Sequence, residues 1–300
     1  MTNIITFTTD WGFKDNYSAI FKAHILSEIR DAVLCDISHD VEKFNITTGI
    51  YLLKSTYHYF PKGSIHVFDV DFLNAQQEHT LVLSKKNKLR EPLNFRDYLA
   101  VKYKGHFFLA INNGVFSILC EQLSEIEEIV KLKKAEEYSN FKTFNAIPYF
   151  VRPVIALAKQ NIPLSELGEA YSPDKIESIK LMQPLIKKSE ELGDVIEFGV
   201  KHIDSYGNII TDLDHNTFSK IAKGRDKVSI YIKGMGNYNV RIANAYSDVS
   251  KNVPIIAVFN LAGYLEIASK FCGIAFLLDF KIANVYDHRF TLSFIDHQDY

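Results

Sequence analysis

The apolar residues in the first half of the chain follow two periods in turn. Short β-branched runs, typical of buried strands, alternate with stripes of apolar residues at helical spacing. Strands are predicted over residues 3–8, 33–37, 64–70, 80–84 and 106–110, and helices over 17–29, over 46–57 and from Pro148 onward. Asp15 is the expected cap of the first helix. This alternation predicts an α/β domain with a mostly parallel sheet flanked by helices.

The second half of the chain is predicted to be all-β. Turn signals separate a series of runs with strand character, and little helical pattern lies between them. The runs cover residues 195–202, 208–213, 227–232, 238–242 and 255–259. Such a series is typical of an antiparallel barrel-like domain. We therefore expect an α/β domain over residues 1–182, a charged linker over 183–193 and a β-barrel-like domain over 194–300.

Composition and charge narrow the class of protein. The 300 residues are 47% hydrophobic, which is enough for sizeable cores in two domains. The 34 basic and 36 acidic residues give a net charge of −2, which argues against a nucleic-acid groove or a polybasic membrane surface. Three scattered cysteines favour a reducing compartment, the longest apolar run is too short to span a membrane, and no signal peptide is visible. A soluble, cytoplasmic protein is expected.

Three short segments carry polar groups where a ligand could bind. Asp10 directly follows the first predicted strand, and Asp69 and Asp71 end the third. Ligands of open parallel sheets bind outside the carboxyl ends of the strands, where a carboxylate can bind a diol, activate water or hold a metal. The third segment is Ile203–Asn208, in which an aromatic ring and an amide are suited to a purine.

Each of these segments also has a purely structural interpretation. Asp10 could be a turn or helix-capping residue, and one aspartate of the pair at 69 and 71 could cap the following loop. Residues 203–208 equally describe a β-turn with glycine at its tight position. The sequence contains no phosphate loop, no GxGxxG after the first strand and no HExxH motif.

The order of the motifs is more specific than any single motif. The chain resembles the S-adenosylmethionine hydroxide adenosyltransferase family, relatives of the fluorinating and chlorinating enzymes, in six segments that run almost from end to end. Residues 8–12 with Asp15 and Tyr17 resemble the family's TTDFG…D.Y, 36–39 its DITH, 60–67 its FPxGTVHV, 110–114 its APDNG, 203–211 its IDxFGNxxTN and 260–268 its NSxGYLEIA.

The resemblance implies a fold, an assembly and a reaction. It implies an α/β domain joined to a β-barrel-like domain, in a homotrimer that binds S-adenosylmethionine between the first domain of one subunit and the second domain of its neighbour. Water or hydroxide would attack the ribose C5′, giving adenosine and methionine, with no cofactor or metal. By position, the implied roles are ribose binding for Asp10, pocket lining for Trp11, ammonium binding for Asp204, base contact for Tyr206 and adenine binding for Asn208.

The chain departs from the family at the water site, where the family has an Asp, an Arg and a His. Asp71 keeps the Asp, but the proline and glycines of VDPGVG are missing after it. Glu78 stands at the Arg position and Asn145 at the His position of TFHGRD. An anion in place of a cation disfavours a hydroxide. The resemblance therefore implies an altered water site beside a retained nucleoside site.

Three functions are compatible with these patterns. The first is an S-adenosylmethionine hydrolase-type protein, adenosine-forming, with its activity lost or altered. The second is a non-catalytic binder of S-adenosylmethionine or adenosine, because the ribose and adenine positions persist while the water site does not. The third, a metal-dependent sugar-nucleotide transferase using Asp69 and Asp71, rests on a three-residue signal. The first two share a small-molecule nucleoside ligand, and neither involves nucleic acid or a membrane.

Overall fold

The computed structural model describes most of the chain as two compact units, Met1–Ile179 and Lys180–Tyr300. Each unit has its own sheet and its own core. The described residues are 4–70, 97–138, 140, 143–160, 162–179, 181, 183–233, 236–248, 255–269, 273–277 and 288–295.

The first unit is an α/β domain built on one seven-stranded sheet of order β2-β1-β3-β5-β4-β6-β7. Strands β2, β1, β3 and β5 run parallel, and β4, β6 and β7 extend the sheet with antiparallel pairings. Its elements are β1 (Ile4–Thr9), α1 (Tyr17–Glu28), β2 (Val33–Ser38), α2 (Ile46–Thr56), β3 (Ile65–Asp69), β4 (Tyr98–Tyr103), β5 (His106–Ile111), α4 (Val115–Leu119), β6 (Ile126–Leu132), α5 (Ala146–Gln160) and β7 (Gly168–Ala170).

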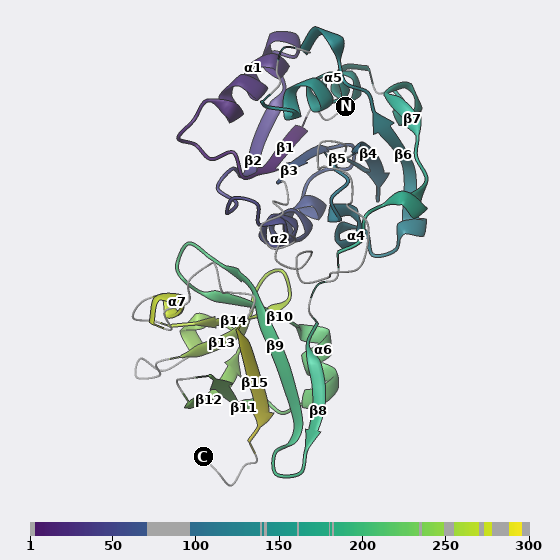
Figure 1. The fold of residues 1–300 in the computed structure, drawn as a ribbon. Helices are drawn as coiled ribbons and strands as arrows, with labels where there is room; N and C mark the ends of the chain where they lie inside the picture. Colours follow the sequence, from purple (N-terminus) through teal and green to yellow (C-terminus); the bar gives the residue numbers. More distant parts are fainter. Residues whose placement is uncertain are drawn as a thin grey trace, which may run out of the picture. The chain divides into compact units, whose positions relative to one another are not determined.

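Helices cover both faces of this sheet, as Figure 1 shows: α1 and α5 lie on one side, and α2 and α4 on the other. Phe21 and Ile25 of α1 pack with α5 in one core, and Ile50 of α2 packs with α4 in the second. Helix α2 can approach β3 closely because it carries Gly49, where an added Cβ would lie 3.0 Å from the Phe68 ring. The layered α/β architecture expected from the sequence is confirmed.

The strand order changes direction at β1, which is the topological switch point of the sheet. The connection through α1 leads from β1 to β2 on one side, and the connection through α2 leads back past β1 to β3 on the other. The loops that leave β1 and β3 therefore diverge at their carboxyl ends. Open α/β sheets bind ligands in the crevice at such a point. Thr9 and Asp69, the last residues of these two strands, pair directly with each other.

The second unit is a closed antiparallel barrel with one parallel pairing among its described strands. Seven strands follow the order β10-β14-β13-β12-β11-β15-β9, and β9 pairs with β10 to close the ring. Strand β8 pairs with the first half of β9. The parallel pair is β12 with β13. The elements are β8 (Leu185–Ser189), β9 (Gly193–Ile203), β10 (Ile209–Asp214), α6 (His215–Ala222), β11 (Lys227–Ile232), β12 (Gly236–Ala243), β13 (Ile256–Phe259), β14 (Tyr264–Ala268), α7 (Ile274–Leu277) and β15 (Arg289–Phe294).

Three local predictions need correction. Residues 185–189 of the expected linker form β8, because its backbone can complete the hydrogen bonds of the edge of β9. Asn16, not Asp15, is at the N-cap of α1, and its side chain makes no capping hydrogen bond. Helix α5 begins at Ala146, two residues before Pro148. The strand predicted over 80–84 lies outside the described residues.

Candidate functional site

The carboxyl ends of β1, β2 and β3 gather the polar residues of the first unit. Asp10 leaves β1, and its Oδ2 accepts a hydrogen bond of 2.9 Å from the backbone N–H of Phe44, in the loop that precedes α2. The ammonium group of Lys43 contacts the Asp10 carbonyl. Phe44 holds this position with a positive φ of 65°, which is uncommon for a large side chain. The Asp10 carboxylate is thus held at the switch point by a conformationally unusual loop.

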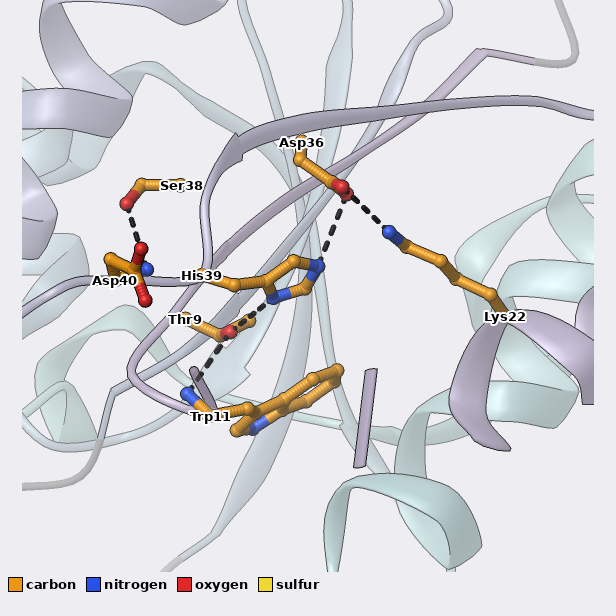
Figure 2. A network of polar contacts seen from close by, with 7 residues as sticks. All are labelled: Thr9, Trp11, Lys22, Asp36, Ser38, His39 and Asp40. Carbon is orange, nitrogen blue, oxygen red and sulfur yellow. Dashed lines mark hydrogen bonds and ion pairs between the residues drawn. The ribbon is translucent and has the colours of Figure 1, made fainter. Parts of the chain in front are cut away.

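Next to Asp10 in the chain, a series of hydrogen bonds with a buried centre at Thr9 and His39 links β1 to β2 (Figure 2). His39 Nδ1 lies 2.6 Å from Thr9 Oγ1, and His39 Nε2 lies 3.1 Å from Asp36 Oδ1. The other Asp36 oxygen accepts a 2.6 Å ion-pair bond from Lys22 on α1. Neither His39 nor Thr9 exposes any surface. This series of hydrogen bonds therefore fixes the end of β1, and it does not present a nucleophile to solvent.

The chemistry of its neighbours determines the tautomer of His39. The Asp36 carboxylate only accepts hydrogen bonds, so Nε2 carries the proton. Burial lowers the pKa of His39, against a smaller opposing effect of Asp36, so the ring is neutral and Nδ1 accepts the Thr9 hydroxyl proton. The Thr9 oxygen is then free to accept the N–H of Trp11 at 3.4 Å. A neutral His39 thus holds the turn that carries Asp10.

Trp11 points into the protein, with 7% of its surface exposed. Its ring stacks on His39 at a centroid distance of 5.5 Å and meets Phe144 edge-on at 4.9 Å. The indole N–H donates a 2.8 Å hydrogen bond to Asp69 Oδ2 at the end of β3. A buried indole N–H requires such an acceptor. Asp69, singled out from the sequence for metal or water chemistry, here anchors Trp11.

The expected water site is only partly within the described residues. Asp71 and Glu78 lie outside them. Asn145 directly precedes α5 and is exposed. Its neighbour Phe144 contacts Trp11, which places Asn145 at the same edge of the sheet as Asp10 and Asp69.

Asn112 and Asn113 follow β5 at this edge and have structural partners. Asn112 binds the segment after β7, through Tyr171, Lys175 and the backbone N–H of Glu177. Asn113 Nδ2 donates a 2.9 Å hydrogen bond to the carbonyl oxygen of Val70. Both side chains thus fix loops at this edge of the sheet.

In the second unit, the remaining predicted residues form one tight turn between β9 and β10. Asp204 Oδ1 accepts the backbone N–H groups of Tyr206 and Asn208 at 2.9 and 2.8 Å, and its Oδ2 accepts Asn208 Nδ2 at 3.0 Å. Gly207 has a φ of +79° and sits against Gly273, so a side chain would fit neither the backbone nor the space. The β-turn expected as the structural interpretation is confirmed and is of the Asx type, and it presents Tyr206 with 80% of its surface exposed.

Two residues that sequence reasoning missed lie against this turn. Tyr246 accepts a 3.4 Å hydrogen bond from Asn208 Nδ2 and donates to the carboxylate of Glu266 on β14. Glu266 is 8% exposed. Glu266 stands within the family-like segment 260–268, which was the one signal available. No local pattern marks Tyr246.

The structure groups the predicted site residues into two sets. Asp10, Trp11 and Asp69 meet at the switch point of the first unit, and Asp204, Tyr206 and Asn208 share one turn of the second. In the described part of the chain no group of three or more His, Cys, Asp or Glu side chains could hold a metal ion. No helix within the same residues is long and apolar enough to cross a membrane.

Comparison with known proteins finds relatives along the whole chain. The family model for the SAM hydroxide adenosyltransferase N-terminal domain matches residues 5–89 and 92–168, and the C-terminal domain model matches 198–275. An (R)-S-adenosyl-L-methionine hydrolase of Methanocaldococcus jannaschii is 28% identical over 296 residues, covering 93% of this chain and 95% of the relative. A fluorinase of Actinoplanes sp. is 24% identical, covering 93% and 94%.

Solved structures confirm the fold. An uncharacterized conserved protein from Thermotoga maritima superposes with a TM-score of 0.76 at 24% identity, covering 96% of this chain and 99% of the other. A conserved hypothetical protein from Thermus thermophilus gives a TM-score of 0.63 at 18% identity, covering 97% and 99%. The α/β domain followed by an all-β barrel is shared along the full chain.

Proposed function

The chain belongs to the S-adenosylmethionine hydroxide adenosyltransferase family, and from this we propose that it binds S-adenosylmethionine and hydrolyses it slowly to adenosine and methionine. The observation that carries the proposal is the place of Asp10: the carboxylate stands at the β1–β3 switch point, where open α/β sheets bind nucleotides. The match of both domain models in order favours this function over a metal-dependent sugar-nucleotide transferase that would use Asp69 and Asp71.

In the proposed reaction one water molecule attacks the ribose C5′ from the side opposite the sulfonium. A C5′–O bond forms, the C5′–S bond breaks, and its electron pair neutralises the sulfonium to give methionine. One proton is released as the attacking water becomes the 5′-hydroxyl of adenosine. The protein must hold the ribose in line with the water and stabilise the attacking oxygen.

The proposed roles follow from the chemistry of each group. The Asp10 carboxylate accepts hydrogen bonds from the two ribose hydroxyls, and Trp11 supports it from behind through His39 and Asp69. Tyr206 and Asn208 contact the base. Asp204 would bind the methionine ammonium in addition to its three bonds within the turn. Asp71 would orient the water.

A single-turnover assay tests the proposal. The full-length protein in excess over S-adenosylmethionine is quenched at intervals, and adenosine and methionine are separated by chromatography. Equal amounts of both products, rising with time and absent without protein, support hydrolysis. If calorimetry shows that S-adenosylmethionine binds but no adenosine forms after many hours, the protein is the non-catalytic binder described next and not a hydrolase.

A non-catalytic binder is the second candidate, and a specific observation favours it. Asn145 is exposed at the edge that carries Asp10 and Asp69, in the place of the histidine of the family motif. An amide cannot take a proton from water near neutral pH. Binding would persist in this case because the nucleoside contacts do not depend on Asn145.

Replacing Asp10 tests the ligand contact. Asp10→Ala is expected to weaken adenosine binding about tenfold or more, because each charge-assisted hydrogen bond to a ribose hydroxyl contributes about 1.5–3 kcal/mol. Asp10→Asn keeps an acceptor for the Phe44 N–H but removes the charge, so its affinity for adenosine should fall between those of the unaltered protein and Asp10→Ala. Calorimetry provides the affinities. Asp31→Asn, at the exposed turn before β2, is the matched control. An unchanged affinity in Asp10→Ala would reduce Asp10 to a loop anchor.

The proposed assembly is a homotrimer, in which the nucleoside is shared between the first domain of one subunit and the second domain of another. The motivation is that the two predicted sets of ligand residues belong to different units of the chain. Sedimentation velocity at micromolar concentration is expected to give three times the chain mass of 34.3 kDa. A species of the single-chain mass under these conditions would contradict the trimer.

A further inference from the structure

The nitrogen end of the Asn208 carboxamide is held from two sides. Asn208 Nδ2 lies 3.0 Å from Asp204 Oδ2 and 3.4 Å from the hydroxyl oxygen of Tyr246. A carboxylate has no proton to donate, so the end of the amide that faces Asp204 must be the donor. The hydrogen-bond network therefore assigns the orientation of the amide.

Glu266 directs the proton of Tyr246. The Tyr246 hydroxyl contacts Oε1 of Glu266, and the Glu266 side chain is buried. The single hydroxyl proton thus goes to Glu266, and the oxygen can only accept from Asn208. Burial, and next the bond to Glu266, raise the pKa of Tyr246, so the hydroxyl remains protonated at physiological pH. The hydrogen bonds run in one direction, from Asn208 to Tyr246 to Glu266.

The opposite end of the amide is the end left for a ligand. Asn208 Oδ1 makes no hydrogen bond with any residue of the described part of the chain. Asn208 is half-buried, and the exposed ring of Tyr206 belongs to the same turn. With both amide protons directed inward, Asn208 offers the base an acceptor and no donor.

We infer that Tyr246 and Glu266 are positioning residues that fix the Asn208 carboxamide with its oxygen toward the ligand, so that the site selects a base with an amino group over one with an oxo group. The inference rests on the proposed function, in which a nucleoside binds at this turn. An oxo group opposite Asn208 Oδ1 would place two acceptors face to face, and both would stay unpaired. A binding site built to accept a hydrogen bond from a ligand strongly disfavours an analogue that lacks the donor.

The test compares adenosine, which has an amino group at C6, with inosine, which has an oxo group at C6 and a proton on N1; in the inference, the C6 group is the one that faces Asn208. Calorimetry on the full-length protein is expected to show adenosine binding at least about tenfold more tightly than inosine. In Tyr246→Phe the ratio should fall at least about threefold, because the amide loses one of the two acceptors that fix it. Tyr231→Phe, on the exposed side of β11, is the matched control and should keep the ratio.

The outcomes separate the inference from the proposed function. A protein that binds neither nucleoside nor S-adenosylmethionine would overturn both. A protein that binds adenosine and inosine equally, or a Tyr246→Phe variant that weakens both by the same factor, would overturn the inference and leave the proposed function standing. If Tyr246→Phe lowers the melting temperature enough to prevent the measurement, Glu266→Gln serves instead, and it should lower the ratio in the same direction.

Discussion

Adenosine formation by this protein is expected to be at least about 10²-fold, and up to about 10⁴-fold, slower than by the archaeal hydrolase among its relatives. A positioned acid–base group contributes about 10²–10⁴-fold to a rate, and one electrostatic stabiliser contributes about 10²–10³-fold. Glu78 and Asn145 occupy the positions where the family-like motifs have a cation and an imidazole. The two proteins would be compared under identical single-turnover conditions.

Restoring both groups should raise the rate. Glu78→Arg with Asn145→His is expected to exceed either single change, because groups that act on one water molecule act as a unit. The paired control is Glu78→Gln with Asn145→Gln, which removes the negative charge without supplying a cation or an imidazole. Rapid turnover by the unaltered protein would show that another group, such as the neighbouring His79, has taken over the task.

Acid is expected to destabilise the first unit through His66, a buried residue of β3 that the proposed reaction does not use. His66 Nδ1 lies 2.7 Å from Thr6 Oγ1, and its Nε2 lies 3.2 Å from His106 Nδ1. Burial, and next the charge of His106, lower the pKa of His66 to about 3. The unfolded chain binds a proton near pH 6.5, so the folded state loses stability as the pH falls from there toward 3. Between pH 6.5 and pH 4.5 this loss is about 2 kcal/mol.

Urea unfolding at several pH values measures this effect. His66→Gln keeps a hydrogen-bonding amide near Thr6 but cannot titrate, so its stability should vary less between pH 6.5 and 4.5 even if it is lower at pH 7. The exposed His58→Gln provides the control, with the pH dependence of the unaltered protein expected. Equal pH dependence in His66→Gln and the unaltered protein would assign acid sensitivity to other groups.

The sequence predicted the elements that have a strong local signal. Short apolar runs and helical stripes predicted β1, α1, β2, α2 and β3 in order. The strand runs of the second half predicted β9 to β13 but not how these strands pair. Strands β4, β6, β7, β8, β14 and β15 were missed. Charged or polar residues interrupt several of them, and some pair with strands far along the chain, as β15 does with β9 and β6 with β4.

The sequence by itself determined the two-domain architecture, the place of Asp10 after a strand and the turn at Asp204, because strand period, helix spacing and turn chemistry are local properties. Only the tertiary structure decided which groups meet. It brought Asp69 to the indole of Trp11, fixed the neutral tautomer of His39, closed the barrel through β9 and β10, and set Tyr246 and Glu266 behind Asn208. Apart from the Asp36–His39 bond and the pairing of consecutive strands β9 and β10, these contacts join residues that are distant in sequence, so no local pattern predicts them.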